Sequence, residues 1–426
     1  MAVTNPQPQL KRELGVFGAT FMGLGSIVGT GVFVSIGIAA GIAGPAVIIA
    51  IAIGALVATF NGLNSAQLAA SHPVSGGTYE YGYRYLTPAF GFTAGWMFLV
   101  AKTASAATAA LGFAGYLVNI LGLSSTLIVP IAFVTVAIMT VIVLSGVKRS
   151  NLANTVIVSV TLLSLVFFIL VCLPRAITEG ASNLSPTLSE VSLPNILQAS
   201  ALMFVAYTGY GRIATMGEEA KNPRVTIPKA MIVCLLLTML LYITVATVGI
   251  GAVGVDVLSQ TKTAPLEAAV RSVAGSGASV VLAIGAMTAM LGVLLNLILG
   301  LSRVWLAMGR RFDAPRFLAR LNQQQTTPHY AVILVGATIA LLVLLGNVKT
   351  TWSFSAFSVL IYYAITNFAA LKLSPQERLY PKWIAILGIL SCLFLAFWVE
   401  SSIWQIGIAL IIAGLIWHKV RRAVLN

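Results

Sequence analysis

Two clusters rich in glycine are the parts of this sequence best suited to bind a small ligand. Residues 23–31 read Gly-Leu-Gly-Ser-Ile-Val-Gly-Thr-Gly, and residues 207–211 read Tyr-Thr-Gly-Tyr-Gly. Glycine at this density interrupts a helix and leaves backbone N–H and C=O groups unpaired. N–H groups that begin a half-helix attract an anion, and carbonyls that end one attract a cation. A ligand with both a carboxylate and an ammonium, such as an amino acid, satisfies both.

The elements that position these clusters must lie in lipid. The chain has 426 residues, 58% hydrophobic and only 8% charged, whereas a soluble protein carries about 25% charged residues. A span needs ~20 apolar residues, and such runs fill the chain. We expect one all-α integral membrane domain over residues 1–426. Its twelve spans are expected at 15–43, 45–70, 89–118, 124–145, 152–173, 195–217, 228–252, 276–309, 329–346, 351–373, 382–400 and 402–420.

The positive charges indicate an orientation. With the N-terminus inside, nineteen of the 25 Lys and Arg residues fall on the cytoplasmic side, four outside and two within spans. Positive residues concentrate on the cytoplasmic side of membrane proteins. We therefore expect a multi-pass protein of the cell membrane with both termini in the cytoplasm. No basic stripe with interleaved aromatics indicates a nucleic-acid partner, despite the net charge of +14.

The two glycine clusters occupy the first and sixth expected spans. That is the spacing of corresponding positions in two five-span halves, and paired breaks of this kind indicate the binding site of a transporter. The alternative is that both clusters are close-packing motifs, because glycine is common at helix contacts in membranes. The paired positions favour the binding site.

Four segments resemble the amino acid–polyamine–organocation superfamily of transporters. They are Gly-Ser-Ile-Val-Gly-Thr-Gly-Val-Phe at 25–33; Pro-Val-Ser-Gly-Gly-Thr-Tyr-Glu-Tyr at 73–81; Phe-Val-Ala-Tyr-Thr-Gly-Tyr at 204–210 with Gly-Glu-Glu-Ala-Lys-Asn-Pro-Arg at 217–224 and Ile-Pro-Lys-Ala at 227–230; and Ser-Arg at 302–303 through Phe-Asp-Ala-Pro at 312–315. The resemblance implies an amino acid permease with the leucine-transporter fold. Residues 15–173 and 195–373 would form two inverted five-helix repeats with broken helices 1 and 6. Residues 382–420 would add two helices, and transport would proceed by alternating access.

The resemblance also implies roles for single residues. The amides of Thr30 and Gly31 would hold the substrate carboxylate, and the carbonyls of Ile27, Val205 and Thr208 would take its ammonium. Residues 101–106 of the third span would face the substrate side chain. The rest of the expected substrate-binding set is Ser26, Gly29, Lys102, Ala206, Tyr207 and Gly209.

The gate is one place where the sequence departs from its relatives. In much of the family an aromatic residue precedes the Ala-Tyr of span six and closes over the substrate, and here that position is Val205. We expect the gating role to fall to Phe204, Tyr207 or Tyr210.

Coupling is the second departure. Many sodium-independent relatives carry a lysine in span five where a sodium ion would sit, and Thr161 takes that place here. Residues 286–292 offer one hydroxyl where a sodium site would have a pair, so sodium coupling is not evident. Lys102 lies within the third span, where a charge is costly and by default functional. It is predicted to replace the missing lysine as a proton carrier or a fixed cation, unless it reaches the cytoplasmic surface.

Other classes of function fit less well. The three histidines and three cysteines form no metal-ligand spacing, and no phosphate-binding glycine loop is present; we expect no enzyme activity, metal or cofactor, and no accessory subunit is indicated. A polyamine or organic cation transporter would need acidic residues near the breaks. None of the 11 acids lies at mid-membrane in spans one, three, six or eight. A neutral or apolar amino acid is the expected substrate, moved by proton coupling or exchange. A non-transporting sensor stays open, as does an acidic substrate if Lys102 faces the site.

Charged residues in the loops are expected to anchor them. Glu80 should pair with a nearby arginine such as Arg84 or one of the group at 310–320. Arg212 either pairs with Glu218 or Glu219 or stands as a simple interfacial arginine.

Overall fold

The computed structural model describes residues 14–73, 76–146, 151–185, 191–214, 220–261, 263–322 and 327–425. Its regular elements are all helices, and every expected span coincides with one or more of them. Within these ranges, eight helical stretches are long and apolar enough to cross a membrane. The all-helical expectation is confirmed and a multi-pass membrane protein is supported. The count of twelve crossings and the inverted repeat stay predictions.

The elements follow one another with short connections. In chain order they are α1 (Val16–Ile27), η1 (Gly31–Ser35), α2 (Ile36–Ala43), η2 (Gly44–Ala46), α3 (Val47–Ser71), α4 (Thr78–Tyr85), α5 (Pro88–Leu121), η3 (Ser125–Leu127), α6 (Ile128–Leu144), α7 (Asn151–Leu184), α8 (Leu193–Tyr207), η4 (Thr208–Tyr210), α9 (Gly211–Ala214), α10 (Pro223–Gln260), α11 (Pro265–Arg310), η5 (Arg316–Ala319), α12 (His329–Val343), α13 (Val348–Leu371), α14 (Lys382–Ala396) and α15 (Ser401–Leu425).

Both glycine clusters interrupt their helices. The first expected span divides into α1 and α2, and Val28 between them is extended, with φ −77° and ψ 102°. The chain then passes through a π-helical turn, η1, which is a frequent form at functional sites. The sixth span divides into α8, the 3-10 turn η4 and the short α9. The breaks therefore lie where the glycine pattern predicts them.

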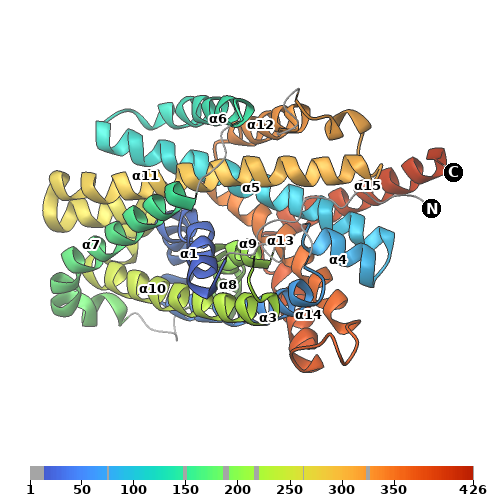
Figure 1. The fold of residues 1–426 in the computed structure, drawn as a ribbon. Coiled ribbons are helices and arrows are strands. Elements are labelled where there is room, and N and C mark those ends of the chain that lie inside the picture. The colour runs from blue at the N-terminus through green and yellow to red at the C-terminus, as the bar shows by residue number, and fades with distance from the viewer. Residues whose placement is uncertain are drawn as a thin grey trace.

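The long helices lie side by side in one bundle (Figure 1). Helices α3 and α10 pack together at one edge, and α6 and α12 pack together at the opposite edge. The broken helices α1 and α8 lie between these edges, where α1 contacts α10 and α8 contacts α3. Both breaks are thus enclosed by other helices, which is where irregular backbone is tolerated at membrane depth.

Several helix ends differ from the expected boundaries. Helix α7 continues through Pro174 to Leu184, past the expected end at 173. Helices α10 and α11 also extend beyond the expected spans, but Gly254 and Gly275 inside them have φ of 75° and 79°. Those glycines sit at the expected boundaries near 252 and 276. The change of hydrophobic pattern therefore marks a kink at which the regular helix is interrupted and a second helical stretch adjoins it.

A buried amide cluster joins α3 to α13 and α14. Asn64 Nδ2 donates to Asn367 Oδ1 at 2.8 Å, and Asn367 Nδ2 donates to Asn61 Oδ1 at 2.5 Å. Gln67 Nε2 donates to Asn64 Oδ1 at 2.8 Å, and Asn61 Nδ2 lies 3.2 Å from the Cys392 sulfur. The four amides are at most 1% exposed. Such side chains hold helices together in a membrane because each satisfies another's polar groups.

A second polar group, the Asp313 cluster, lies at the end of the bundle that carries α4. Asp313 Oδ2 accepts hydrogen bonds from the hydroxyls of Tyr79, at 2.7 Å, and Tyr83, at 2.5 Å. Its Oδ1 lies 3.2 Å from His418 Nδ1 on α15. Phe312, just before it, has a φ of 64°, which is uncommon for a residue with a side chain. This bend after α11 turns the Asp313 carboxylate between α4 and α15.

An ion pair lies beside this cluster. Arg311 bonds to Glu80 of α4, and its guanidinium also lies 4.5 Å from the centre of the Tyr83 ring. The pairing of Glu80 with the arginine group at 310–320 is therefore confirmed. Glu218 and Glu219, the expected partners of Arg212, lie outside the described residues.

Candidate functional site

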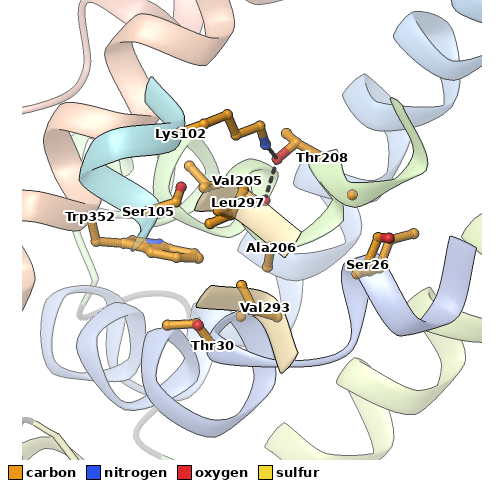
Figure 2. Close-up of a pocket in the computed structure, with 13 residues that line it drawn as sticks. Ser26, Thr30, Lys102, Ser105, Val205, Ala206, Thr208, Val293, Leu297 and Trp352 are labelled. Atoms are coloured by element: carbon orange, nitrogen blue, oxygen red, sulfur yellow. Dashed lines mark hydrogen bonds between the residues drawn. The ribbon is translucent and has the colours of Figure 1, made fainter. Parts of the chain in front are cut away.

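The two helix breaks border a common cavity of about 50 Å³ (Figure 2). That volume is room for roughly three to five water molecules. Its lining comes from α1 and η1, from α8 and η4, and from the facing sides of α5, α11 and α13. The lining residues are Ser26, Ile27, Thr30, Gly31, Lys102, Ser105, Val205, Ala206, Thr208, Gly209, Val293, Leu297 and Trp352.

The first break presents hydrogen-bond donors to the cavity. The half-helix after the break begins with the N–H groups of Val32 and Phe33, which both donate to Gly29 O, at 3.1 and 3.2 Å. The N–H groups of Thr30 and Gly31 precede these first donors, as the free N–H groups of a helix start do. Thr30 Oγ1 is buried and has no partner among the described residues. This end of the cavity suits an anionic group such as a carboxylate.

Carbonyl groups gather at the other side of the breaks, and hydroxyls already bond each of them. Ile27 O accepts from the Tyr242 hydroxyl at 3.0 Å, and Thr208 O accepts from the Tyr363 hydroxyl at 3.2 Å. Val205 O accepts from the Thr208 hydroxyl at 2.8 Å. The backbone N–H of Thr208 also donates to Val205 O, so both lone pairs of that carbonyl are occupied. Ile27 O and Thr208 O each have a second lone pair beside the hydroxyl that they accept. Hydroxyls therefore hold the carbonyls of Ile27 and Thr208 in place and leave each able to accept a hydrogen bond from an ammonium.

Tyr242 ties the two breaks together, which gives a first prediction. Its hydroxyl bonds to Ile27 O and also lies 3.3 Å from Ala206 O. Tyr242→Phe is expected to lower the free energy of unfolding by about 1–3 kcal/mol, because a buried acceptor loses its donor. Thermal unfolding in detergent measures the change. Tyr330→Phe, on the half-exposed Tyr330 of α12, is the control that should unfold as the wild type does. Equal unfolding of all three proteins would contradict the role given to Tyr242.

Glycine brings the two breaks into direct contact. A Cβ atom added to Gly209 would lie 2.1 Å from Ser26 O and 2.6 Å from Ile27 N. One added to Gly31 would lie 2.7 Å from the Ala206 Cβ. The two interpretations of the glycine clusters, as close packing and as a binding site, are thus compatible. The same glycines let the backbones touch and leave their polar groups facing the cavity.

Lys102 projects into the cavity from the middle of α5 (Figure 2). Helix α5 is well bounded: Pro88 starts it after the Thr87 cap, and Gly122 ends it with a φ of 63°. The amine of Lys102 donates to Thr208 Oγ1 at 2.9 Å. The side chain therefore points across to the second break and not toward a surface.

Four lining residues were missed by sequence reasoning, although one lies in an expected stretch. Ser105 falls within residues 101–106, and its hydroxyl is 2.7 Å from that of Ser355. Val293 and Leu297 are one helical turn apart on α11. Trp352 is the fifth residue of α13, and its Nε1 donates to Leu202 O at 3.0 Å. Apolar residues at helical spacing carry no functional signal in a membrane span, so composition could not single them out.

Other expected site residues lie away from the cavity lining. Tyr207 is fully buried and donates to Ile51 O of α3 at 3.3 Å. Phe204 and Tyr210 pack on Tyr363, with ring centres 5.8 and 5.2 Å away. Trp352 presents its indole to the cavity instead.

Three other positions complete the account of the expected residues. Gly29 packs on Val293, and a Cβ there would lie 2.7 Å from Val293 Cγ2. Thr161 on α7 donates to Ile157 O at 2.7 Å, outside the cavity. Arg212 lies on α9, next to η4. The described ranges contain no group of three or more His, Cys, Asp or Glu side chains placed to hold a metal ion.

Known proteins resemble this chain over its length. The family described as amino acid permease matches residues 18–422. An uncharacterized transporter of Mycobacterium bovis is 36% identical over 98% of the chain and 92% of its own length. The branched-chain amino acid permease BcaP of Bacillus subtilis is 29% identical over 98% and 93%. A methylthioribose transporter of the same species is 26% identical over 95% and 93%.

Proposed function

The chain belongs to the amino acid permease family, and from this premise we propose that it is a secondary transporter of a neutral, apolar amino acid. Transport would proceed by alternating access, without sodium, between two inverted repeats at 15–173 and 195–373. The protein would lie in the cell membrane with both termini in the cytoplasm, the orientation favoured by the positive residues.

The chemistry of the two breaks supports an amino acid as the ligand. The carboxylate would take the N–H groups of Thr30 and Gly31, which precede the first backbone donors of their half-helix. The Thr30 hydroxyl, buried and unpartnered in the described structure, would donate to the same group. The ammonium would take the second lone pairs of the carbonyls of Ile27 and Thr208, beside the Val205 carbonyl, which already accepts two hydrogen bonds from Thr208. A molecule with one carboxylate and one ammonium on neighbouring atoms matches this arrangement.

The walls of the cavity support an apolar side chain. Val205, Val293, Leu297 and Trp352 surround the space between the breaks. Among the described residues that line it, none carries a carboxylate. A polyamine or a basic amino acid would bury a positive charge there without a partner, at high cost. The name of the branched-chain permease relative agrees with a substrate of this shape.

One observation carries the proposal: two broken helices meet around a cavity with the N–H groups of a half-helix start on one side, carbonyls on the other and an apolar wall. Uptake of radiolabelled leucine into proteoliposomes tests it, with valine, isoleucine, lysine, glutamate, putrescine and methylthioribose as unlabelled competitors. Leucine should accumulate without sodium, and the branched-chain amino acids should compete. Competition by putrescine or methylthioribose alone would overturn the choice of substrate. Binding of leucine without any flux would favour a sensor.

The size of the wall gives a second prediction. Leu297→Ala is expected to enlarge the cavity, so that phenylalanine should compete with leucine about tenfold better than in the wild type. Competition curves in proteoliposomes measure the shift. Leu341→Ala, on the exposed face of α12, is the matched control, and phenylalanine should compete with leucine there as weakly as in the wild type. Unchanged competition by phenylalanine in Leu297→Ala would mean that the substrate side chain binds away from Leu297.

A further inference from the structure

The amine of Lys102 occupies the part of the cavity that suits an ammonium. It donates to Thr208 Oγ1 at 2.9 Å, and that hydroxyl donates to Val205 O at 2.8 Å (Figure 2). Two of the three carbonyls named for the substrate ammonium, those of Val205 and Thr208, thus belong to the residues that Lys102 contacts through this chain of hydrogen bonds. Any ligand ammonium placed there becomes a close neighbour of the lysine.

No group in the described structure balances a charge on this lysine. No carboxylate of the described residues lies at ion-pair distance, and the other lining residues are uncharged. Two other titratable groups on helices packed against α5 have partners of their own: Glu267 of α11 pairs with Arg271, and His418 of α15 lies beside Asp313. The titratable side chains around Thr208 are tyrosines. Tyr363 donates to Thr208 O at 3.2 Å, Tyr210 packs on Tyr363, and the Tyr362 hydroxyl accepts from Thr78 N at 3.3 Å. From α1 and α11, only uncharged residues line the cavity.

Two positive charges cannot share this place. A zwitterion brings its own balancing carboxylate, but that group is expected at the amides of Thr30 and Gly31, on the other side of the breaks. The substrate ammonium and a protonated Lys102 would then meet at Thr208 with no anion between them. Like charges a few ångströms apart in a site of low polarity repel strongly, and the cheapest relief is the loss of a proton.

We propose that a neutral amino acid binds with release of one proton from Lys102, so that substrate and proton occupy the cavity in turn. This inference rests on the proposed function. The N–H bond of the ammonium breaks, the electron pair stays on the lysine nitrogen, and the proton passes to water on the side to which the cavity is open. The neutral amine can still bond to Thr208, or accept a hydrogen from the substrate ammonium. On release of the substrate, Lys102 takes a proton from the other side.

This alternation has a direction. The protein with neutral Lys102 carries the substrate across the membrane, and the protein with protonated Lys102 returns without it. Substrate and proton therefore travel in opposite directions. If the substrate weakens the binding of the proton to Lys102, the proton must weaken the binding of the substrate by the same factor. The dissociation constant for leucine should fall as the pH rises, by up to about tenfold per pH unit while Lys102 remains protonated, and then level off.

Calorimetry in detergent counts the proton directly. Leucine binding is measured at one pH in two buffers of different protonation enthalpy, and the difference in heat gives the protons released. The wild type should release one proton per leucine wherever Lys102 starts protonated. Lys102→Met should bind leucine with no proton release and no pH dependence. Lys102→Arg, which stays charged, should bind leucine far more weakly at every pH.

The control is Lys349→Met, which removes a lysine that pairs with Glu400 at 2.6 Å, away from the cavity. It should keep the wild-type proton count. Size-exclusion profiles and thermal unfolding show that each variant is folded. Saturable leucine binding by the wild type with no released proton at any pH overturns this inference and leaves the proposed function standing. No binding of any amino acid overturns the proposed function itself.

Leucine efflux under a pH gradient is an independent test of the exchange. Proteoliposomes loaded with labelled leucine should lose it faster when the outside is made acidic, and Lys102→Met should lose this response. Faster loss with an acidic interior, which is the behaviour of co-transport with protons, would also overturn the inference.

Discussion

Gly209→Ala is expected to abolish amino acid uptake. The added methyl group would lie 2.1 Å from Ser26 O and 2.3 Å from the Ser26 carbonyl carbon. Both are backbone atoms of the other broken helix, so no side-chain rotation can relieve the contact. Overpacking a tight contact costs about 1–3 kcal/mol or more, and displacing positioning groups by about 1 Å can reduce activity on the order of 100-fold. Leucine uptake in proteoliposomes measures the loss.

The control for this variant is Gly300→Ala on α11. A Cβ there would meet nothing within 4 Å, and its backbone is helical. Alanine is the better helix former, so Gly300→Ala should fold and transport at least as well as the wild type. Uptake by Gly209→Ala at half the wild-type rate or more would mean that the two breaks separate during transport far enough to admit a methyl group.

Asp313→Ala should produce the largest loss of stability. The two tyrosine hydroxyls that donate to Asp313 would lose their acceptor, and His418 would lose the carboxylate 3.2 Å away. Each buried polar group left unpaired costs about 1–3 kcal/mol, so the free energy of unfolding should fall by about 3 kcal/mol or more. Thermal unfolding in detergent measures it. The amide oxygen of Asp313→Asn still accepts a hydrogen bond, so the unfolding temperature of this variant should lie between those of Asp313→Ala and the wild type.

The matched control removes an exposed acid on the surface of α10. Asp256 is exposed on α10, and Asp256→Ala should unfold with the wild type. An unfolding temperature for Asp313→Ala equal to that of Asp256→Ala would show that α4, α11 and α15 hold together without the Asp313 cluster.

The breaks could be predicted from the sequence because their cause is local. Glycine clusters weaken a helix wherever they occur, and the positions of the two clusters in the first and sixth spans suggested that they work together. Eight expected residues line the cavity for this reason, and Lys102 of α5 is the ninth. The family was identified from ordered motifs, which also depend only on neighbouring residues.

The partners of the breaks could not be predicted in this way. Tyr242 and Tyr363 bond to carbonyls 215 and 155 positions away in the chain. Nothing in their own surroundings distinguishes them from other tyrosines in spans. The same holds for Tyr207, whose place next to the break suggested a gate. Its rotation about the helix axis, which aims it at Ile51, depends on the packing of α8 on α3.

The amide cluster also has a consequence for how the chain is made. Asn61 on α3 must wait for Asn367, 306 positions later, before its amide oxygen receives a hydrogen bond. At synthesis rates of about 5–20 residues per second, that delay is roughly 15–60 seconds. During this time Asn61 needs water, insertion machinery or a chaperone as a partner, whereas the side-chain N–H groups of Asn64 and Gln67 have acceptors within α3. A ribosome stalled before α13 would leave a nascent chain prone to wrong helix pairing and to recognition by quality-control proteases.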